Sequence, residues 1–457
     1  MPTVPPPTAP ARRPAPSRVH YAWVVLAVAT LVVFASLGLA RFGYTMLLPP
    51  MQAGLGLDNA QAGALATANL AGYLALAVLG GALASHFGPR VVIAAGLAVA
   101  ALGMLLTGLA GSFAAAMGWR ALTGLGSGAS NVPVMALLSG WFGRRRRGLA
   151  AGVAVTGSSF AVILLGPLVP RLLEAFGADG WRACWLGFGG VTLLLAVLAL
   201  ALLRDRPAEL GLAPLAAGPE EAPAGGTSRA APARSDAPRP AGDPSTSPVG
   251  SPGQPPGALP HWSSVYRSPV VWHVGLIYVA FGFSYIIYVT FFTKYLIAER
   301  GYTQAEAGGL FMTLGWLSLA CGLLWGWVSD HIGRKAALVI VYLIHTLAFG
   351  LFALWPAPPG LLLSAVLFGL SAWSIPAIMA ALCGDLLGPR LAPAGLGFIT
   401  LFFGIGQALA PSAAGLIADA AGSLAPAMLL AAGVALLGAL GSLLLRSPSN
   451  GVSSSWA

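Results

Sequence analysis

The chain alternates between long apolar stretches and short connectors that hold most of its charged residues. A helix needs about 20 apolar residues to cross a membrane, because it rises about 1.5 Å per residue. The predicted spans are residues 21–49, 60–84, 90–110, 114–140, 148–170 and 182–203, followed by 270–296, 306–328, 336–355, 360–384, 393–418 and 424–445. This pattern predicts an all-α membrane protein with twelve transmembrane helices.

The twelve spans form two related groups of six. Residues 59–90 align without a gap with residues 304–335, and ten of the 32 positions are identical. Two six-helix pseudo-repeats in parallel order are the architecture of a large class of secondary transporters. Between the groups, a stretch rich in proline and glycine is too polar to build a core, so it is expected to be disordered. The predicted organisation is a disordered N-terminal tail (1–19), an N-terminal half (20–204), a disordered cytoplasmic linker (205–268), a C-terminal half (269–446) and a C-terminal tail (447–457).

Composition and charge agree with a membrane protein. Only 8% of the 457 residues are charged, whereas about 25% is usual in a soluble domain. The net charge of +10 does not indicate nucleic-acid binding, because the basic residues lie in connectors. With both termini cytoplasmic, the inner connectors and tails hold 18 of the 24 Lys and Arg residues and the outer loops hold four. The positive-inside rule therefore predicts a multi-pass protein of the cell's inner membrane with cytoplasmic termini.

One connector carries a recognisable motif. The loop GWVSDHIGRK resembles the major facilitator superfamily signature Gly-x-x-x-Asp-(Arg/Lys)-x-Gly-(Arg/Lys)-(Arg/Lys). The matching residues are Gly326, Asp330, Gly333, Arg334 and Lys335. The resemblance implies that these residues act as a conformational latch between the two access states. In the first copy, GALASHFGPR, a serine replaces the acid, which puts the latch of that half in doubt.

Two further stretches support and refine the resemblance. RALTGLGSG, from Arg120, is similar to a fourth-helix motif of the superfamily. LRDRPAELGLAPL, from Leu203, looks like the segment after the sixth helix in bacterial monocarboxylate and oxalate–formate antiporter relatives. By this resemblance the substrate is a small organic anion.

Embedded polar residues are the candidates for substrate binding, because a charge within a span must face a partner or a wet cavity. Arg41 and Arg120 are the two basic residues that lie within spans, both toward the outer side. Ser127 and Asn131 follow Arg120 at helical spacing, and the seventh span has an aromatic face. The predicted substrate-binding residues are Arg41, Tyr44, Arg120, Ser127, Asn131, Tyr285, Tyr288 and Gln407. The alternative for the arginines is a structural role on backbone carbonyls, and for the aromatic face it is packing.

The spans lack deep acidic residues. A carrier of organic cations would need an embedded carboxylate as counter-charge, so the two arginines favour an anionic substrate. Coupling to protons is left open, with the proton on a loop-edge acid, on a histidine such as His273, or on the substrate. No catalytic residues, metal site or cofactor are predicted, because neither a nucleophile–base set nor a ligand cluster appears.

These observations predict a secondary active transporter that moves a small organic anion, a monocarboxylate, across the inner membrane by alternating access. We expect a monomer in the lipid bilayer. The alternatives are proton-coupled drug or metabolite efflux and a non-transporting membrane sensor with a transporter fold.

Overall fold

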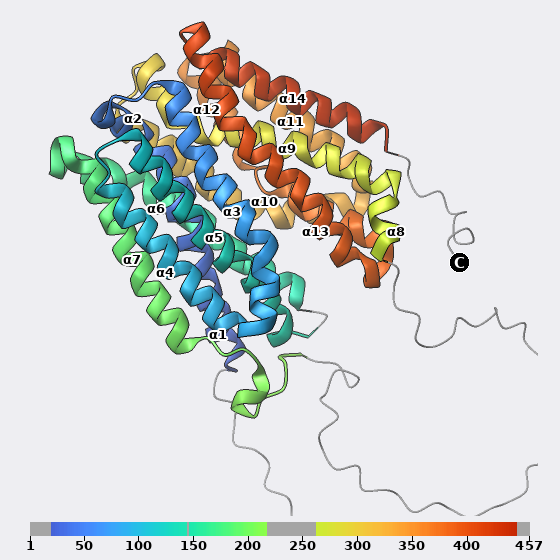
Figure 1. The fold of residues 1–457 in the computed structure, drawn as a ribbon. Helices are drawn as coiled ribbons and strands as arrows, with labels where there is room; N and C mark the ends of the chain where they lie inside the picture. The colour runs from blue at the N-terminus through green and yellow to red at the C-terminus, as the bar shows by residue number, and fades with distance from the viewer. Residues whose placement is uncertain (1–19, 144–145, 217–261, 446–457) are drawn as a thin grey trace, which may run out of the picture.

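A computed structural model describes residues 20–143, 146–216 and 262–445 as a helical protein (Figure 1). The first group of elements is α1 (Ala22–Val33), η1 (Phe34–Phe42), α2 (Gly43–Leu55), α3 (Asn59–Phe87), α4 (Pro89–Gly108), α5 (Phe113–Trp141), α6 (Arg147–Phe176), η2 (Gly177–Asp179), α7 (Gly180–Leu202) and η3 (Pro207–Leu210). The second group is α8 (Trp262–Arg267), α9 (Pro269–Lys294), η4 (Tyr295–Glu299), α10 (Gln304–Ile332), α11 (Arg334–Leu354), α12 (Pro358–Gly369), α13 (Ser374–Ala421) and α14 (Ala425–Leu443).

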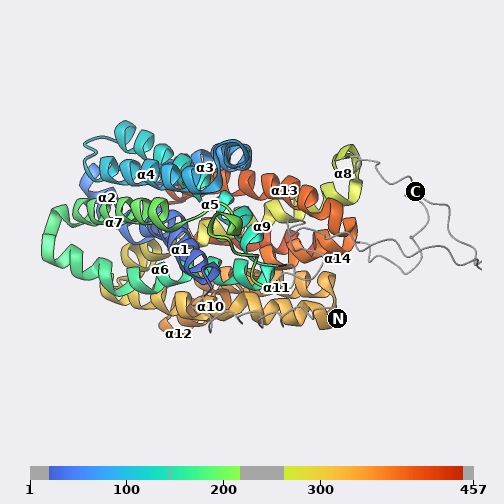
Figure 2. The ribbon, with the colours of Figure 1, turned by 90° about the horizontal axis from the view of Figure 1, so that it is seen from below.

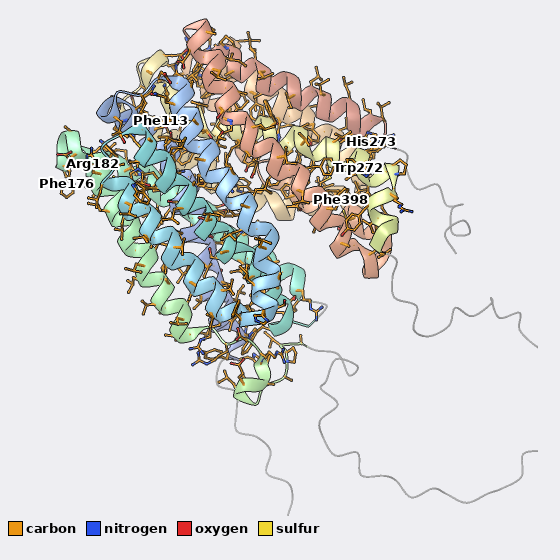
Figure 3. The ribbon with its side chains drawn as sticks, viewed as in Figure 1. Phe113, Phe176, Arg182, Trp272, His273 and Phe398 are labelled. Carbon is orange, nitrogen blue, oxygen red and sulfur yellow. The ribbon has the colours of Figure 1, made fainter. Side chains whose placement is uncertain are left out.

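The described ranges contain the twelve predicted transmembrane helices. Nine helical stretches in them are long and apolar enough to cross a membrane, and two bent helices raise that number to 11. One stretch, Arg147–Leu202, is 56 residues long and turns back at η2, so it contains two crossings, α6 and α7. Figure 3 shows Phe176 and Arg182 at this turn. The long helix α13 is likewise divided at Gly388, whose φ of 69° interrupts the helical backbone.

The predicted tails fall outside the described residues, as does most of the predicted linker. The proposed boundaries of the two halves, 20–204 and 269–446, stay predictions. Within the first group α3, α4, α5 and α7 pack together, and within the second α9 packs on α13 and α11 on α14. The blue-to-green and yellow-to-red groups lie side by side in Figures 1 and 2.

Among the described residues, the main contacts between the two halves are those of α3 with α13, α6 with α10, and α2 with α9. Figure 2 shows the α3–α13 and α6–α10 pairs on opposite sides of the molecule. We call the end of the bundle where α3 begins the Asn59 end, and the end where α3 meets α4 the Gly88 end. A large buried apolar cluster continues from one half into the other around the Asn59 end. A second cluster, near the Gly88 end, belongs to the first half alone.

Close backbone packing holds the halves together toward the Asn59 end. A Cβ atom on Gly63 would lie 2.1 Å from the carbonyl oxygen of Pro411, and one on Gly415 would lie 2.2 Å from that of Asn59. On the other side, a Cβ on Gly166 would lie 2.5 Å from the carbonyl oxygen of Gly308. Glycine at these positions therefore lets helices of opposite halves approach closely.

Polar contacts add to this closure. The carboxylate of Asp419, in α13, accepts hydrogen bonds from the backbone N–H groups of Asn59 (3.0 Å) and Ala60 (2.7 Å), which open α3. An acid is favourable there because the N-terminus of a helix carries partial positive charge. Lys294 of α9 donates to the side-chain oxygen of Asn59. Gln304, which opens α10, donates to the carbonyl oxygen of Met46 at 2.9 Å. The structure is thus closed between the halves at the Asn59 end.

Candidate functional site

The first predicted span, residues 21–49, lies within one continuous helical stretch, Ala22–Leu55, but this stretch is not α-helical throughout. Residues Phe34–Phe42 form the π-helical segment η1, a conformation that is rare and often found at functional sites. Tight packing accompanies it, because a Cβ on Gly38 would lie 2.1 Å from the Cβ of Ala161 in α6. Arg41 lies in the last turn of this segment.

Arg41 lies at the boundary between the two halves. Its Nη1 atom donates to the hydroxyl of Tyr285 in α9 at 3.5 Å. Its guanidinium carbon lies 4.8 Å from the ring centre of Tyr73 in α3, within the range of a cation–π interaction. The Nη2 atom is buried and has no hydrogen-bond partner among residues 20–143, 146–216 and 262–445. Among the described residues, no carboxylate forms an ion pair with Arg41.

Two amide side chains, one from each half, bond to the tyrosines that contact Arg41. Gln407 of α13 is 2% exposed and donates from Nε2 to the hydroxyl of Tyr285, which is also 2% exposed. Asn131 of α5 donates from Nδ2 to the hydroxyl of Tyr73 at 2.9 Å. The structure therefore brings together four of the predicted residues: Arg41, Asn131, Tyr285 and Gln407.

Tyr73 and Trp373 belong to the same site and were missed by the sequence analysis. Trp373 lies in the break between α12 and α13, and its ring is 6.0 Å from that of Tyr285 and 5.5 Å from that of Phe42. Its Nε1 atom is buried and finds no hydrogen-bond partner among the residues that the structure describes. A hint for Trp373 was available in the sequence: it is the last aromatic residue before Pro376, where a helix is prone to break. For Tyr73 there was no comparable signal.

Arg120 lies deeper, within the first half. It is 1% exposed, and its guanidinium carbon lies 4.7 Å from the ring centre of Tyr44 and 4.9 Å from that of Trp185. Its Nη1 atom donates to the carbonyl oxygen of Ala40, in the π-helical segment, at 2.8 Å. These contacts fit the structural alternative, in which the arginine fastens helices together. Its Nε atom is buried and has no hydrogen-bond partner among the described residues, and substrate contact by Arg120 stays a prediction.

Three other predicted residues bond within their own half. The hydroxyl of Tyr44 donates to the carbonyl oxygen of Ala62 at 2.7 Å, and that of Ser127 to the carbonyl oxygen of Thr123 in its own helix at 2.9 Å. Tyr288 shares a 2.8 Å hydrogen bond with Ser364 and is surrounded by phenylalanine rings of the second half. Their proposed role in substrate binding therefore has little geometric support.

His273, the histidine named as a candidate proton carrier, lies near the start of α9. Figure 3 shows it beside Trp272, next to α8. Twelve residues separate it from Tyr285, which corresponds to about 18 Å along a helix. It is therefore remote from the site around Arg41.

The loop motif of the second half is held by ion pairs. Arg334 pairs with Asp330 and, from Nε, with a carboxylate oxygen of Asp385 at 3.1 Å; it also donates from Nη1 to the hydroxyl of Ser329 at 2.6 Å. Gly333 has a φ of 87°, which favours glycine. Asp385 ties this loop to α13, so the motif residues join three helices. Gly326 and Lys335 lie in the adjoining ends of α10 and α11.

In the first half, an acid from another part of the chain occupies the corresponding loop. Asp205, which follows α7, accepts a 2.6 Å hydrogen bond from the backbone N–H of Arg90. The side chain of Arg90 donates to the carbonyl oxygen of Leu200 at 2.8 Å. Asp205 therefore caps α4 and supplies the negative charge that the motif lacks at Ser85.

Comparison with known proteins matches this arrangement to one family. The family model described as Major Facilitator Superfamily matches residues 30–392 and 295–456. The chain belongs to the Major Facilitator Superfamily. As a member of this superfamily, it is a multi-pass membrane transporter and not an enzyme.

Relatives of this superfamily member include transporters with named substrates. It is 22% identical to the hexuronate transporter of Bacillus subtilis over 416 residues, 88% of this chain and 89% of that protein. It is 25% identical to the probable sulfoacetate transporter SauU of Cupriavidus necator over 446 residues, 94% of this chain and 95% of that protein. Mouse monocarboxylate transporter 11 is 35% identical over 200 residues, 43% of this chain and 42% of that protein.

Solved structures share the superfamily fold. A bacterial homolog of the human lysosomal transporter Spinster, in an inward-facing conformation, has a TM-score of 0.70 and 17% identity, covering 95% of this chain and all of that one. The D-xylose–proton symporter has a TM-score of 0.67 and 14% identity, covering 94% and 98%.

Proposed function

We propose that this superfamily member moves a small organic anion, a monocarboxylate, across the inner membrane by alternating access. The observation that carries the proposal is the position of Arg41. Its charge lies between the halves, on a π-helical turn of the first span, and one of its guanidinium nitrogens is buried without a partner.

An unpaired charge away from water is costly. The described residues offer Arg41 the aromatic ring of Tyr73 and the hydroxyl of Tyr285, but no carboxylate that pairs with it. A substrate carboxylate would supply the missing charge and could form two parallel hydrogen bonds with the guanidinium group. The proposed contact set is therefore Arg41 with Tyr73, Asn131, Tyr285 and Gln407.

The same residues connect binding to a change of access. Arg41, Tyr73 and Asn131 belong to the first half, whereas Tyr285 and Gln407 belong to the second. A bound anion that neutralises Arg41 changes the free energy of bringing the halves together, and a ligand shifts a conformational equilibrium only through such a difference. With the positive-inside orientation, both termini and the Gly88 end are cytoplasmic, so a closed Asn59 end corresponds to inward access.

The names of the relatives support an anionic substrate. Hexuronate, sulfoacetate and monocarboxylates all carry a carboxylate group, and they are the substrates named for three of the relatives of this chain. We therefore propose a substrate that carries a carboxylate group, without assigning any one of those compounds to this chain.

A binding experiment tests the proposal. Purified protein in detergent is heated with each member of a panel of mono- and dicarboxylates, because a ligand that binds only the folded state raises the melting temperature. We expect at least one acid to stabilise the parent and to lose its effect in Arg41→Gln. The exposed Arg171 provides the charge-matched control, Arg171→Gln, which should keep the response. Stabilisation that survives in Arg41→Gln, or no response to any acid, would contradict the proposal.

A further inference from the structure

Three buried polar atoms around Arg41 have no hydrogen-bond partner in the part of the chain that the structure describes: Nη2 of Arg41, Nε1 of Trp373 and Oδ1 of Asn131. Buried polar atoms are normally hydrogen-bonded, so an unpaired one calls for an explanation such as a missing ligand. The first two are donors and the third is an acceptor. The site thus has a defined and incomplete pattern of hydrogen-bonding groups.

The three side chains are linked through the rings of two tyrosines. Asn131 bonds to the hydroxyl of Tyr73, and the guanidinium group of Arg41 lies on the ring of the same tyrosine. On the other side, Arg41 donates to the hydroxyl of Tyr285, whose ring meets that of Trp373 edge-on at 81°. Asn131 and Arg41 come from the first half and Trp373 from the second, so both halves contribute to the set.

A ligand that completes this pattern needs acceptors for the two donors and a donor for the acceptor. A carboxylate meets the first requirement, since its oxygens accept from Arg41 and from the indole N–H of Trp373. An unsubstituted acid leaves Oδ1 of Asn131 unpaired. A keto oxygen or a second carboxylate places another acceptor against it, whereas a hydroxyl group donates a hydrogen bond to it.

We propose that the site selects carboxylates that carry a hydroxyl group, with Asn131 recognising the hydroxyl and Trp373 helping Arg41 to hold the carboxylate. This inference rests on the proposed function and narrows its substrate class. Asn131 is then a specificity-determining residue, because it acts on the choice among acids. Arg41 and Trp373 hold the carboxylate that all of these acids share.

A series of four-carbon acids tests this selection: butyrate, 2-hydroxybutyrate, 3-hydroxybutyrate and 2-oxobutyrate. Their dissociation constants are measured by titration calorimetry on the purified full chain. One added hydrogen bond to a buried acceptor should make the better hydroxy acid bind about ten-fold more tightly than butyrate. The keto acid should bind no more tightly than butyrate.

Two variants separate recognition from packing. Asn131→Leu has a similar shape and no acceptor, so it should remove the preference for the hydroxy acid while butyrate still binds. Tyr73→Phe removes the same Asn131–Tyr73 hydrogen bond but keeps the acceptor, so it should retain the preference. Trp373→Phe keeps a ring and removes the indole N–H, so it should weaken every acid in the series by a similar factor, about three- to ten-fold.

The outcomes distinguish this inference from the function on which it rests. If butyrate, the hydroxy acids and the keto acid bind equally and all need Arg41, the proposed function holds and the hydroxyl selection is wrong. If the keto acid binds best, the amide of Asn131 presents its N–H group, and the inference is overturned. If no acid binds, both are overturned.

Discussion

The closed Asn59 end depends on Asp419, and neutralising this residue should open it. In Asp419→Asn the side chain keeps its shape but loses its charge, and only one of its two polar atoms can still accept a hydrogen bond. The parent carboxylate holds two backbone N–H groups at the start of α3, at 3.0 Å and 2.7 Å, across the boundary between the halves. Because Asp419 is exposed, water competes for these N–H groups. We therefore expect the substitution to destabilise the closed Asn59 end by about 1 kcal/mol.

That free energy corresponds to about a five-fold shift toward states with an open Asn59 end. The shift can be followed through a thiol introduced by Thr45→Cys. Thr45 is 2% exposed, and it joins the halves through its backbone carbonyl, which accepts from Thr293, so the substitution leaves this contact in place. The native cysteines Cys184, Cys321 and Cys383 are buried. A membrane-impermeant maleimide should therefore label the introduced thiol about five times faster when Asp419→Asn is added to the Thr45→Cys parent.

Asp58→Asn is the matched control. Asp58 also caps α3, with a 2.7 Å hydrogen bond from the N–H of Gln61, but it belongs to the same half as α3. Its loss should weaken the helix end without opening the boundary. Equal labelling rates in Asp419→Asn and its parent would refute the reasoning, as would an equal increase in Asp58→Asn.

Three further predictions follow from the packing. Gly63→Ala places a Cβ 2.1 Å from a backbone oxygen of the other half, so it should increase labelling of the introduced thiol more than Asp419→Asn does; labelling at the parent rate would count against it. Arg120→Ala removes a fully buried side chain packed on two rings, so it should cost about 2–4 kcal/mol and lower the melting temperature more than Arg41→Gln does; an unchanged melting temperature would contradict the structural role. Asp205→Ala removes the cap of α4 and should cost about 1 kcal/mol, measured as a lower melting temperature, whereas the exposed neighbour variant Glu209→Ala should have a smaller effect.

The twelve spans could be predicted from the sequence because length and hydropathy alone decide whether a helix crosses a membrane. The division into two related groups was also visible, since the glycine, histidine and loop positions repeat. The π-helical segment inside the first span could not be predicted. Phe34–Phe42 packs closely on α6 at Gly38, a contact that its own sequence does not indicate.

The site around Arg41 could be predicted only in part. Arg41 could be identified as a candidate because it is a lone charge in an apolar run. Helical spacing placed Asn131 on the same helix face as Arg120, a face expected to point inward. Its partner Tyr285 lies 244 residues away, so their contact depends on how the two halves meet. Spacing also could not distinguish the role of Arg41 at the site from the structural role of Arg120. The rings that enclose Arg120 come from two other helices, so its packing is visible only in the fold. Asp205 was missed for the same reason: it replaces a missing motif acid from outside the motif.

The most direct test of the central claim is exchange of a labelled acid by purified protein in liposomes. The hydroxy acid that binds best is loaded inside, and uptake of the same acid with a radioactive label is followed from outside. The account predicts uptake by the parent and by Arg171→Gln, and at least a ten-fold slower rate in Arg41→Gln, since the lost charge-assisted bonds are worth about 1.5–3 kcal/mol. Uptake by Arg41→Gln at the parent rate would contradict the claim that Arg41 binds the transported anion.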